Sequence, residues 1–205
     1  MIGTKILEER KSKYNGNLKV CRSLGMGTYI QAEGLTQSGG IVESIWKSTL
    51  RHLHARYDLQ STLILGLGGG TVAKLIRKKY SNAKITGIDI DPVMIELGKK
   101  YLHLDDYKVK IIIGDVSNFS NLPKQQFDLV IVDLYQGDKF PEKFETDAFI
   151  NMARTLLADN GTIVFNRLYY GEKRPEAVKF GNRLTKVFSK VDWFYPEANL
   201  MFICS

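Results

Sequence analysis

The chain contains little of what a disulfide framework or a metal centre requires. Its 205 residues include two cysteines and three histidines. Cys21 and Cys204 lie near opposite ends and form no paired motif, so we expect two reduced thiols in a reducing compartment. His52 and His54 are two residues apart, which on a helix directs them to different sides, and His103 stands alone. We therefore expect no metal and a cytoplasmic location.

Long runs of one residue type are also missing. No stretch approaches the ~18 consecutive apolar residues of a membrane-spanning helix, and residues 1–14 contain no apolar core of signal-peptide length, so we expect no membrane partner. The 29 lysines and arginines exceed the 22 aspartates and glutamates, for a formal net charge of +7, yet no run of five basic residues occurs. This pattern favours a solvated basic surface, while a nucleic-acid partner stays open.

What the sequence does contain is an alternation of strands and helices. From residue 61 onward, five apolar segments alternate with segments whose apolar residues recur at helical spacing, which is typical of a parallel sheet covered on both faces. The last two strands, KVDWFY and NLMFICS, are separated by a few residues around Pro196. A link this short requires an antiparallel pair.

The first forty residues follow a different pattern. Residues 14–21 and 28–32 read as two short strands joined around Gly25 and Gly27, which indicates a hairpin. We expect an α/β fold in which this β-hairpin element, residues 1–40, precedes a doubly wound, mostly parallel Rossmann-like sheet, residues 41–205, with a terminal antiparallel strand pair.

The segment LILGLGGGT, residues 63–71, concentrates glycine at the end of a strand. Gly66, Gly68 and Gly70 leave a backbone that a ligand can approach closely. Thr71 occupies the position where a dinucleotide fingerprint requires glycine or alanine. From the glycines alone, a tight turn without a ligand stays open as an alternative.

Three aspartates end the strands that follow. Asp89 lies 19 residues after Gly70, where a carboxylate can accept hydrogen bonds from both hydroxyls of a ribose. Asp115 ends IIIGD and Asp133 ends FDLVIVD. Taken singly, these residues could cap a helix, form an Asx turn or solubilise a strand end. Because parallel strands end at one edge of a sheet, the three aspartates and the glycines together indicate a nucleoside site.

In its order GxGxG, IDID, IIIGD and VIVD, the sequence resembles class I S-adenosylmethionine-dependent methyltransferases, and most closely their spermidine-synthase branch of aminopropyltransferases. The resemblance covers residues 14–168 and includes EGLTQS, in which Gln37 matches a ligand-contacting glutamine. It implies S-adenosylmethionine or its decarboxylated form as cofactor, with the ribose on Asp89 and the adenine amine on Asp115. It further implies that Asp133 lies beside the reacting nucleophile. The ribose and the amino-acid tail would lie along Gly66, Gly68, Gly69 and Gly70.

The sequence departs from the aminopropyltransferases where they bind charged amines. Gly69 replaces the aspartate that holds the amine of the decarboxylated donor, and Gln136 replaces a second aspartate near the catalytic one. Trp46 replaces a substrate-side tyrosine, whereas Glu43 is retained. A diamine needs carboxylates to bind its two charges. These losses favour methyl transfer to a small-molecule amine or hydroxyl over aminopropyl transfer in polyamine biosynthesis.

Asp133 is the predicted catalytic residue, because transfer from a sulfonium mainly requires that the nucleophile be positioned and deprotonated. We expect Trp46, Tyr135 and Gln136 to line the acceptor pocket, although Trp46 could pack in the core and Tyr135 could be an ordinary loop residue. The loop YQGDKFPEKFE should cover the site. A nicotinamide-dependent oxidoreductase and a non-catalytic nucleoside- or nucleic-acid-binding module are the alternatives. The resemblance also suggests a homodimer.

Overall fold

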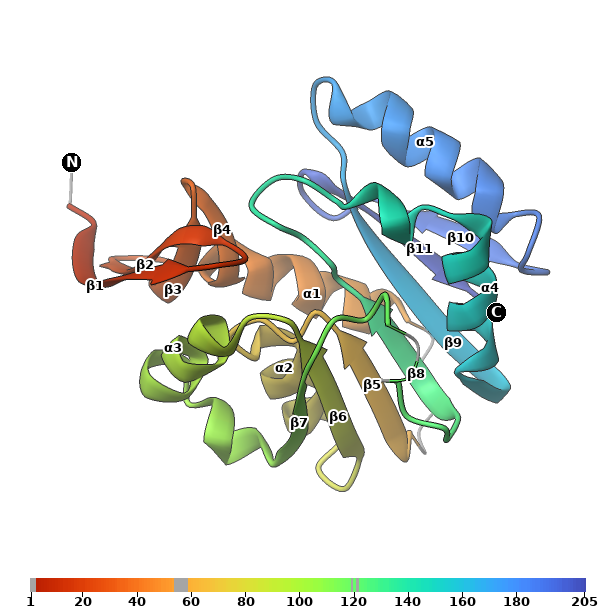
Figure 1. The fold of residues 1–205 in the computed structure, drawn as a ribbon, viewed down its shortest axis with the longest axis horizontal. Coiled ribbons are helices and arrows are strands. Elements are labelled where there is room, and N and C mark those ends of the chain that lie inside the picture. The colour runs from red at the N-terminus through yellow and green to blue at the C-terminus, as the bar shows by residue number, and fades with distance from the viewer. Residues whose placement is uncertain (1–2, 54–58, 119, 121) are drawn as a thin grey trace.

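The computed structural model describes residues 3–53, 59–118, 120 and 122–205, which form two sheets connected by a helix (Figure 1). The first sheet is antiparallel, with its strands in chain order: β1 (Lys5–Ser12), β2 (Gly16–Ser23), β3 (Gly27–Ala32) and β4 (Leu35–Gly39). Helix α1 (Gly40–His52) follows β4 directly and leads to the second sheet.

The second sheet has seven strands in the order β10-β11-β9-β8-β5-β6-β7. These strands are β5 (Ser61–Leu65), β6 (Lys84–Asp89), β7 (Val109–Ile113), β8 (Phe127–Val132), β9 (Leu157–Leu168), β10 (Val191–Phe194) and β11 (Asn199–Cys204). Strands β5 to β9 pair in parallel, whereas β11 pairs antiparallel with both β9 and β10. The doubly wound α/β sheet and its terminal antiparallel pair are therefore confirmed.

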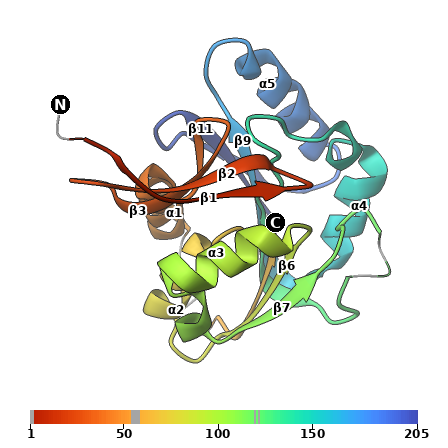
Figure 2. The same ribbon diagram turned by 60° about the vertical axis from the view of Figure 1, so that its left-hand side comes forward.

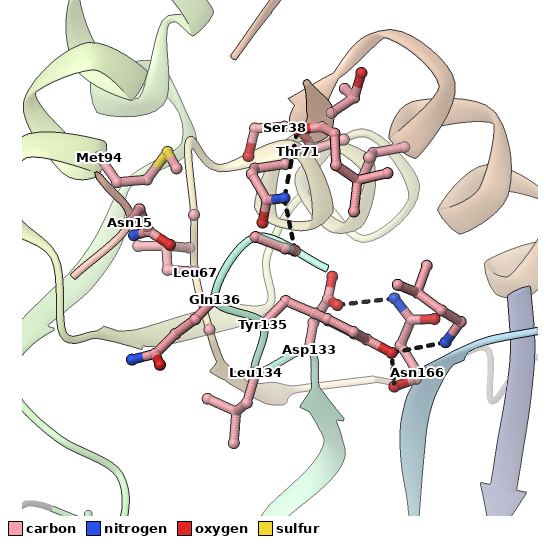
Figure 3. Close-up of a pocket in the computed structure, with 18 of the residues that line it drawn as sticks. Asn15, Ser38, Leu67, Thr71, Met94, Asp133, Leu134, Tyr135, Gln136 and Asn166 are labelled. Carbon is pink, nitrogen blue, oxygen red and sulfur yellow. Dashed lines mark hydrogen bonds between the residues drawn. The ribbon is translucent and has the colours of Figure 1, made fainter. Parts of the chain in front are cut away.

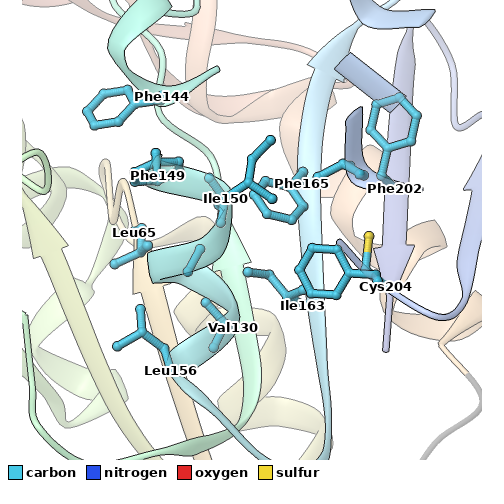
Figure 4. Close-up of a cluster of buried hydrophobic side chains, with 14 of the residues drawn as sticks. Leu65, Val130, Phe144, Phe149, Ile150, Leu156, Ile163, Phe165, Phe202 and Cys204 are labelled. Carbon is cyan, nitrogen blue, oxygen red and sulfur yellow. The ribbon is translucent and has the colours of Figure 1, made fainter. Parts of the chain in front are cut away.

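Helices cover both faces of this sheet. They are α1, α2 (Thr71–Lys79), α3 (Pro92–Leu102), α4 (Asp147–Thr155) and α5 (Lys173–Leu184), with short 3-10 turns η1 (Leu104–Tyr107) and η3 (Glu142–Phe144). Successive residues of β5 point to opposite faces: Leu63 and Leu65 join the core under α4 and α5, and Ile64 joins the core under α1 and α2. Figure 4 shows the first of these cores. None of the described helices is long and apolar enough to cross a membrane.

The N-terminal element is larger than the predicted hairpin. The expected strands correspond to β2 and β3, and β1 and β4 extend them to a four-stranded sheet. Leu18, Val20 and Ile30 of this sheet pack against Met94 and Leu97 of α3. Figure 2 shows β1 and β2 lying above α3. Because β4 runs straight into α1, the small sheet is held at the edge where the parallel strands end.

Candidate functional site

A cavity of about 310 Å³ opens at the carboxyl ends of the parallel strands. Both sheets, the glycine turn after β5 and the segment after β8 contribute to its wall (Figure 3). The wall includes most of the residues predicted from the sequence: Gln37, Trp46, Gly66, Gly68, Asp89, Asp115, Asp133, Tyr135 and Gln136. The structure therefore brings these residues together at one cavity.

The glycines after β5 divide into two groups. Gly66 has a φ of +88°, and a Cβ there would overlap the carbonyl group of Asp133. This close approach of two backbones brings the glycine turn beside the end of β8. Gly69 and Gly70 do not line the cavity: a Cβ on Gly69 would meet Ser38, Ile30 and Leu102, and one on Gly70 would meet Leu104. Both glycines serve the packing of the turn, and their contact with the donor stays a prediction.

Asp89 faces the cavity and also organises the turn. Its carboxylate accepts hydrogen bonds from the backbone N–H of Gly68 at 2.7 Å and of Asp91 at 2.9 Å. Burial raises the pKa of Asp89 to about 6, although these N–H groups lower it in part. The cap of α3 is Asp91, whose Oδ1 accepts from the backbone N–H of Val93. Asp89 is thus not needed as a helix cap.

The small sheet supplies a residue that the sequence did not indicate. Asn15, in the turn between β1 and β2, lines the cavity and donates from Nδ2 to Asp91 at 2.7 Å. The hydroxyl of Ser12 donates to the same carboxylate oxygen. Asp91 therefore fixes the small sheet over the cavity at the end of β6.

Asp115 forms both a local turn and an ion pair. Its Oδ1 accepts from the backbone N–H of Ser117 at 2.8 Å, which confirms the Asx turn considered from the sequence. Its Oδ2 lies 2.7 Å from the ammonium of Lys143 in η3. Burial would raise the pKa of Asp115, but Lys143 and Ser117 outweigh it, and the pKa lies below its ordinary value. No sequence pattern pointed to Lys143.

Asp133 is held by two neutral donors. Its Oδ2 accepts from the indole N–H of Trp46 at 3.0 Å, and its Oδ1 accepts from Nδ2 of Asn166 at 2.8 Å. Burial raises the pKa of Asp133, and the two hydrogen bonds lower it only in part. No cation is recorded against this carboxylate among the described residues. A carboxylate oriented in this way can accept a proton from a nucleophile.

The side chains of Trp46 and Asn166 fix Asp133 from other elements, and Tyr135 is anchored to the strand that carries Asn166. Trp46 is fully buried and packs in the core, and its indole N–H reaches Asp133. Its contact with an acceptor stays a prediction. Asn166 Oδ1 accepts from Nδ2 of Asn199 at 2.7 Å. The hydroxyl of Tyr135 accepts from the backbone N–H of Leu168, and Figure 3 shows Tyr135 directed toward Asn166. The amide of Asn166 was not predicted.

The loop after β8 borders the cavity, as expected. Gln37 donates from Nε2 to the backbone carbonyl of Gly137 at 3.0 Å, and Lys173 at the start of α5 lies 3.3 Å from Asp138. Gln136 is exposed at the cavity wall. The retained Glu43 lies outside the wall and is paired with Lys74 at 2.9 Å.

No group of three or more His, Cys, Asp or Glu side chains in the described parts of the chain is placed to hold a metal ion. His52 stacks on Phe194 with ring centroids 4.1 Å apart and lies 2.8 Å from Asp192. His54 lies outside the described residues.

Comparison with known proteins gives one consistent result. Residues 43–196 match the family model of the spermine/spermidine synthase domain. The polyamine aminopropyltransferase of Hydrogenobaculum sp. is 28% identical over 198 residues, which cover 93% of this chain and 70% of that protein. The corresponding protein of Sulfurisphaera tokodaii is 33% identical over 64% of this chain and 46% of its own length. The polyamine aminopropyltransferase of Vibrio vulnificus is 28% identical over 108 residues, which cover 51% of this chain and 36% of that protein. This chain thus spans between 36% and 70% of these relatives.

Solved structures agree on the fold. Spermidine synthase from Thermotoga maritima superposes with a TM-score of 0.78 at 20% identity, covering 97% of this chain and 72% of that one. Human methyltransferase-like protein 13, in complex with SAH, gives a TM-score of 0.63 at 17% identity, covering 80% of this chain and 79% of that one. At such identities the likeness concerns the fold, which both kinds of transferase share.

Proposed function

We infer the function of this chain from one premise: it belongs to the spermine/spermidine synthase family. We propose that it transfers the aminopropyl group of decarboxylated S-adenosylmethionine to an amine. The relatives are named polyamine aminopropyltransferases, which supports this alternative more than the methyl transfer favoured from the sequence. The observation that carries the proposal is the carboxylate of Asp133, oriented by neutral donors at the cavity wall.

The order of the strands fits a nucleoside laid along the edge of the sheet. Asp133 follows β8, the glycine turn follows β5, Asp89 ends β6 and Asp115 follows β7, and these strands are neighbours in this order. At roughly 4.8 Å per strand, about 14 Å separate the outer two. We propose that the ribose binds at Asp89, the base at Asp115, and the sulfonium near Gly66 beside Asp133.

The proposed reaction is an in-line displacement. The lone pair of the acceptor nitrogen forms a bond to the carbon of the aminopropyl group next to sulfur, the carbon–sulfur bond breaks, and its electrons stay on sulfur in neutral methylthioadenosine. The nitrogen loses a proton to Asp133. Because burial raises the pKa of Asp133, its carboxylate is a stronger base than an exposed aspartate.

A further carboxylate lines the cavity. Glu197, in the turn between β10 and β11, lines the cavity, is exposed, and has no recorded hydrogen bond or ion pair within the described residues. Its φ of +53° is unusual for a residue with a side chain. Glu197 can bind a second ammonium group of the acceptor, and it compensates for the uncharged Gln136.

Methyl transfer from intact S-adenosylmethionine is the second candidate, and one observation favours it. Helix α2 begins after Gly70 without a side-chain cap, and its first residues, Thr71 and Val72, line the cavity. The N-terminus of a helix attracts anions, so it would favour the carboxylate that only the intact donor carries.

The co-product distinguishes the two reactions. The protein is incubated with 1,4-diaminobutane and either donor, and the nucleoside products are separated by chromatography. We expect methylthioadenosine from the decarboxylated donor and little S-adenosylhomocysteine from the intact one. Formation of S-adenosylhomocysteine alone would replace the proposal by the second candidate, and no nucleoside product from either donor with any amine would reject both.

A further inference from the structure

We propose that Lys143 is a specificity-determining residue for the nucleobase of the donor. Asp115 and Lys143 act together in this proposal: the carboxylate accepts from the exocyclic amine of adenine, and the ammonium donates to the ring nitrogen next to that amine. The inference rests on the proposed function, because it requires an adenosine ligand in this cavity.

The contacts of Lys143 place its ammonium at the base end of the cavity. Lys143 and Phe144 line the wall together with Asp115 and its neighbours Gly114 and Val116. The ammonium lies 2.7 Å from Oδ2 of Asp115 and 5.0 Å from the centre of the Phe144 ring. The position of this lysine is therefore set by an ion pair and by an aromatic ring.

The ammonium of Lys143 has an N–H donor that can bind a ligand. A lysine side chain carries three N–H donors and no acceptor. One donor reaches Asp115 and a second reaches the hydroxyl of Ser117 at 3.1 Å. No further hydrogen bond of Lys143 is recorded within the described residues, so its third N–H can serve a ligand in the cavity.

The carboxylate of Asp115 as acceptor and the ammonium of Lys143 as donor match adenine. They do not match a purine that carries an oxygen at position 6. Adenine presents its amine as a donor beside the acceptor nitrogen N7 on one edge, whereas guanine presents the acceptors O6 and N7 there. The amine also lies beside N1 on the opposite edge. A carboxylate next to an ammonium 2.7 Å away can bind such a donor–acceptor pair, while an oxygen in place of the amine would face the carboxylate of Asp115.

A purely structural role for Lys143 makes a different prediction. If the ammonium only held the loop after β8 against Asp115, its removal would weaken every nucleoside ligand by the same factor. If it bonds a ring nitrogen, its removal should have no effect on a ligand that lacks that nitrogen. The two roles can therefore be separated by changing the ligand as well as the protein.

The test measures the affinities of methylthioadenosine and its 1-deaza and 7-deaza analogues by calorimetry for the parent protein and for Lys143→Met. We expect Lys143→Met to weaken methylthioadenosine roughly 10- to 100-fold, the scale of a hydrogen bond from a charged group. One of the two analogues should bind the variant and the parent equally well, which also identifies the nitrogen. Lys139→Met, an exposed position in the same loop outside the cavity wall, should leave all affinities within about twofold.

Equal weakening of all three ligands in Lys143→Met, or no weakening of any, would overturn the inference and leave the proposed function intact. If the parent protein does not bind methylthioadenosine, the proposed function fails, and the inference fails with it. Lys143→Met should unfold at the same temperature as Lys139→Met, because its side chain is partly exposed.

Discussion

Asp89 and Asp133 illustrate how residues of one type acquire different roles from their hydrogen-bond partners. Asp89 accepts from backbone N–H groups of the turns around it, which directs its carboxylate and fixes those turns. Asp133 accepts from two side chains, Trp46 and Asn166, that come from other elements. Removal of Asp89 should therefore disturb the turns that border the cavity, whereas a conservative change of Asp133 should leave those turns intact.

The raised pKa of Asp89 predicts a pH dependence of nucleoside binding. The ionised carboxylate accepts hydrogen bonds from ribose hydroxyls, and its ionised fraction falls as pH drops through a pKa of about 6. We expect the affinity for methylthioadenosine to be constant near pH 8 and to fall below pH 6, by up to about tenfold per pH unit. Calorimetric titrations between pH 5 and pH 8 measure this change in affinity.

Asp89→Asn is the matched control, because the amide keeps one acceptor oxygen and cannot titrate. Its affinity should be lower at pH 8 and should not change with pH. The stability of the ligand-free protein should change with pH in the opposite direction. Since the pKa of Asp89 is higher in the folded than in the unfolded state, its contribution to stability decreases as pH rises from about 4 to about 6. A parent affinity independent of pH would exclude Asp89 as the ribose acceptor.

Residue types decided how much of the site the sequence could predict. Glycines and aspartates at strand ends form a pattern along the chain, so Gly66, Asp89 and Asp133 were found. Asn166 and Lys143 belong to common types with no such pattern, and their roles depend on partners from distant elements, Asp133 and Asp115. Only the fold brings these pairs together.

At the scale of elements, the glycine turn after β5 and the end of β8 depend on each other. The backbone N–H of Asp133 donates to the carbonyl of Leu65 at 2.8 Å, and the next residue, Gly66, has no room for a side chain beside Asp133. The glycine turn and Asp133 are therefore parts of one backbone arrangement.

Gly66→Ala tests this dependence, with Gly25→Ala as its control. Both glycines have a φ near +90°, but a Cβ on Gly25 meets nothing within 4 Å. We expect Gly25→Ala to lower the free energy of unfolding by about 1–2 kcal/mol, the cost of a left-handed conformation. Gly66→Ala should cost roughly 1–3 kcal/mol more, because the backbone of Asp133 must move. Equal losses in urea titrations would show that the two segments are not in close contact.

Elements with a strong hydrophobic period were predicted well, and those without one were missed. The apolar strands β5, β6 and β8 need no partner to be recognised. In β1, KILEERKS, only Ser12 is buried, and β4 lies in EGLTQSGG, which reads as a turn. These two strands are stabilised by pairing with β2 and β3 rather than by their own pattern.

At the scale of the whole molecule, the small sheet and the large domain share a core. Leu18 is fully buried against α3, and the ion pair between Glu8 and Lys100 and the hydrogen bond from Ser12 to Asp91 also join the two parts. Residues 1–40 should therefore unfold together with residues 41–205, although the sequence distinguishes them.

Leu18→Ala should lower the free energy of unfolding of the entire molecule by about 2–5 kcal/mol, the cost of a large-to-small change in a core. Leu24→Ala, at a position 79% exposed in the turn between β2 and β3, should change it by less than about 0.5 kcal/mol. Thermal unfolding should show one transition in every case. Two transitions, of which only one responds to Leu18→Ala, would make the small sheet an independent unit.

In the proposed reaction, this molecule transfers a group from an adenosyl sulfonium to an amine whose proton Asp133 accepts. The most direct test compares the parent with Asp133→Asn in the rate of methylthioadenosine formation from the decarboxylated donor and in affinity for methylthioadenosine. An asparagine keeps the shape and one acceptor oxygen but cannot take the proton. We expect a rate of methylthioadenosine formation roughly 10²–10⁴-fold lower in Asp133→Asn, with the affinity for methylthioadenosine within about threefold of the parent. A rate close to that of the parent would contradict it.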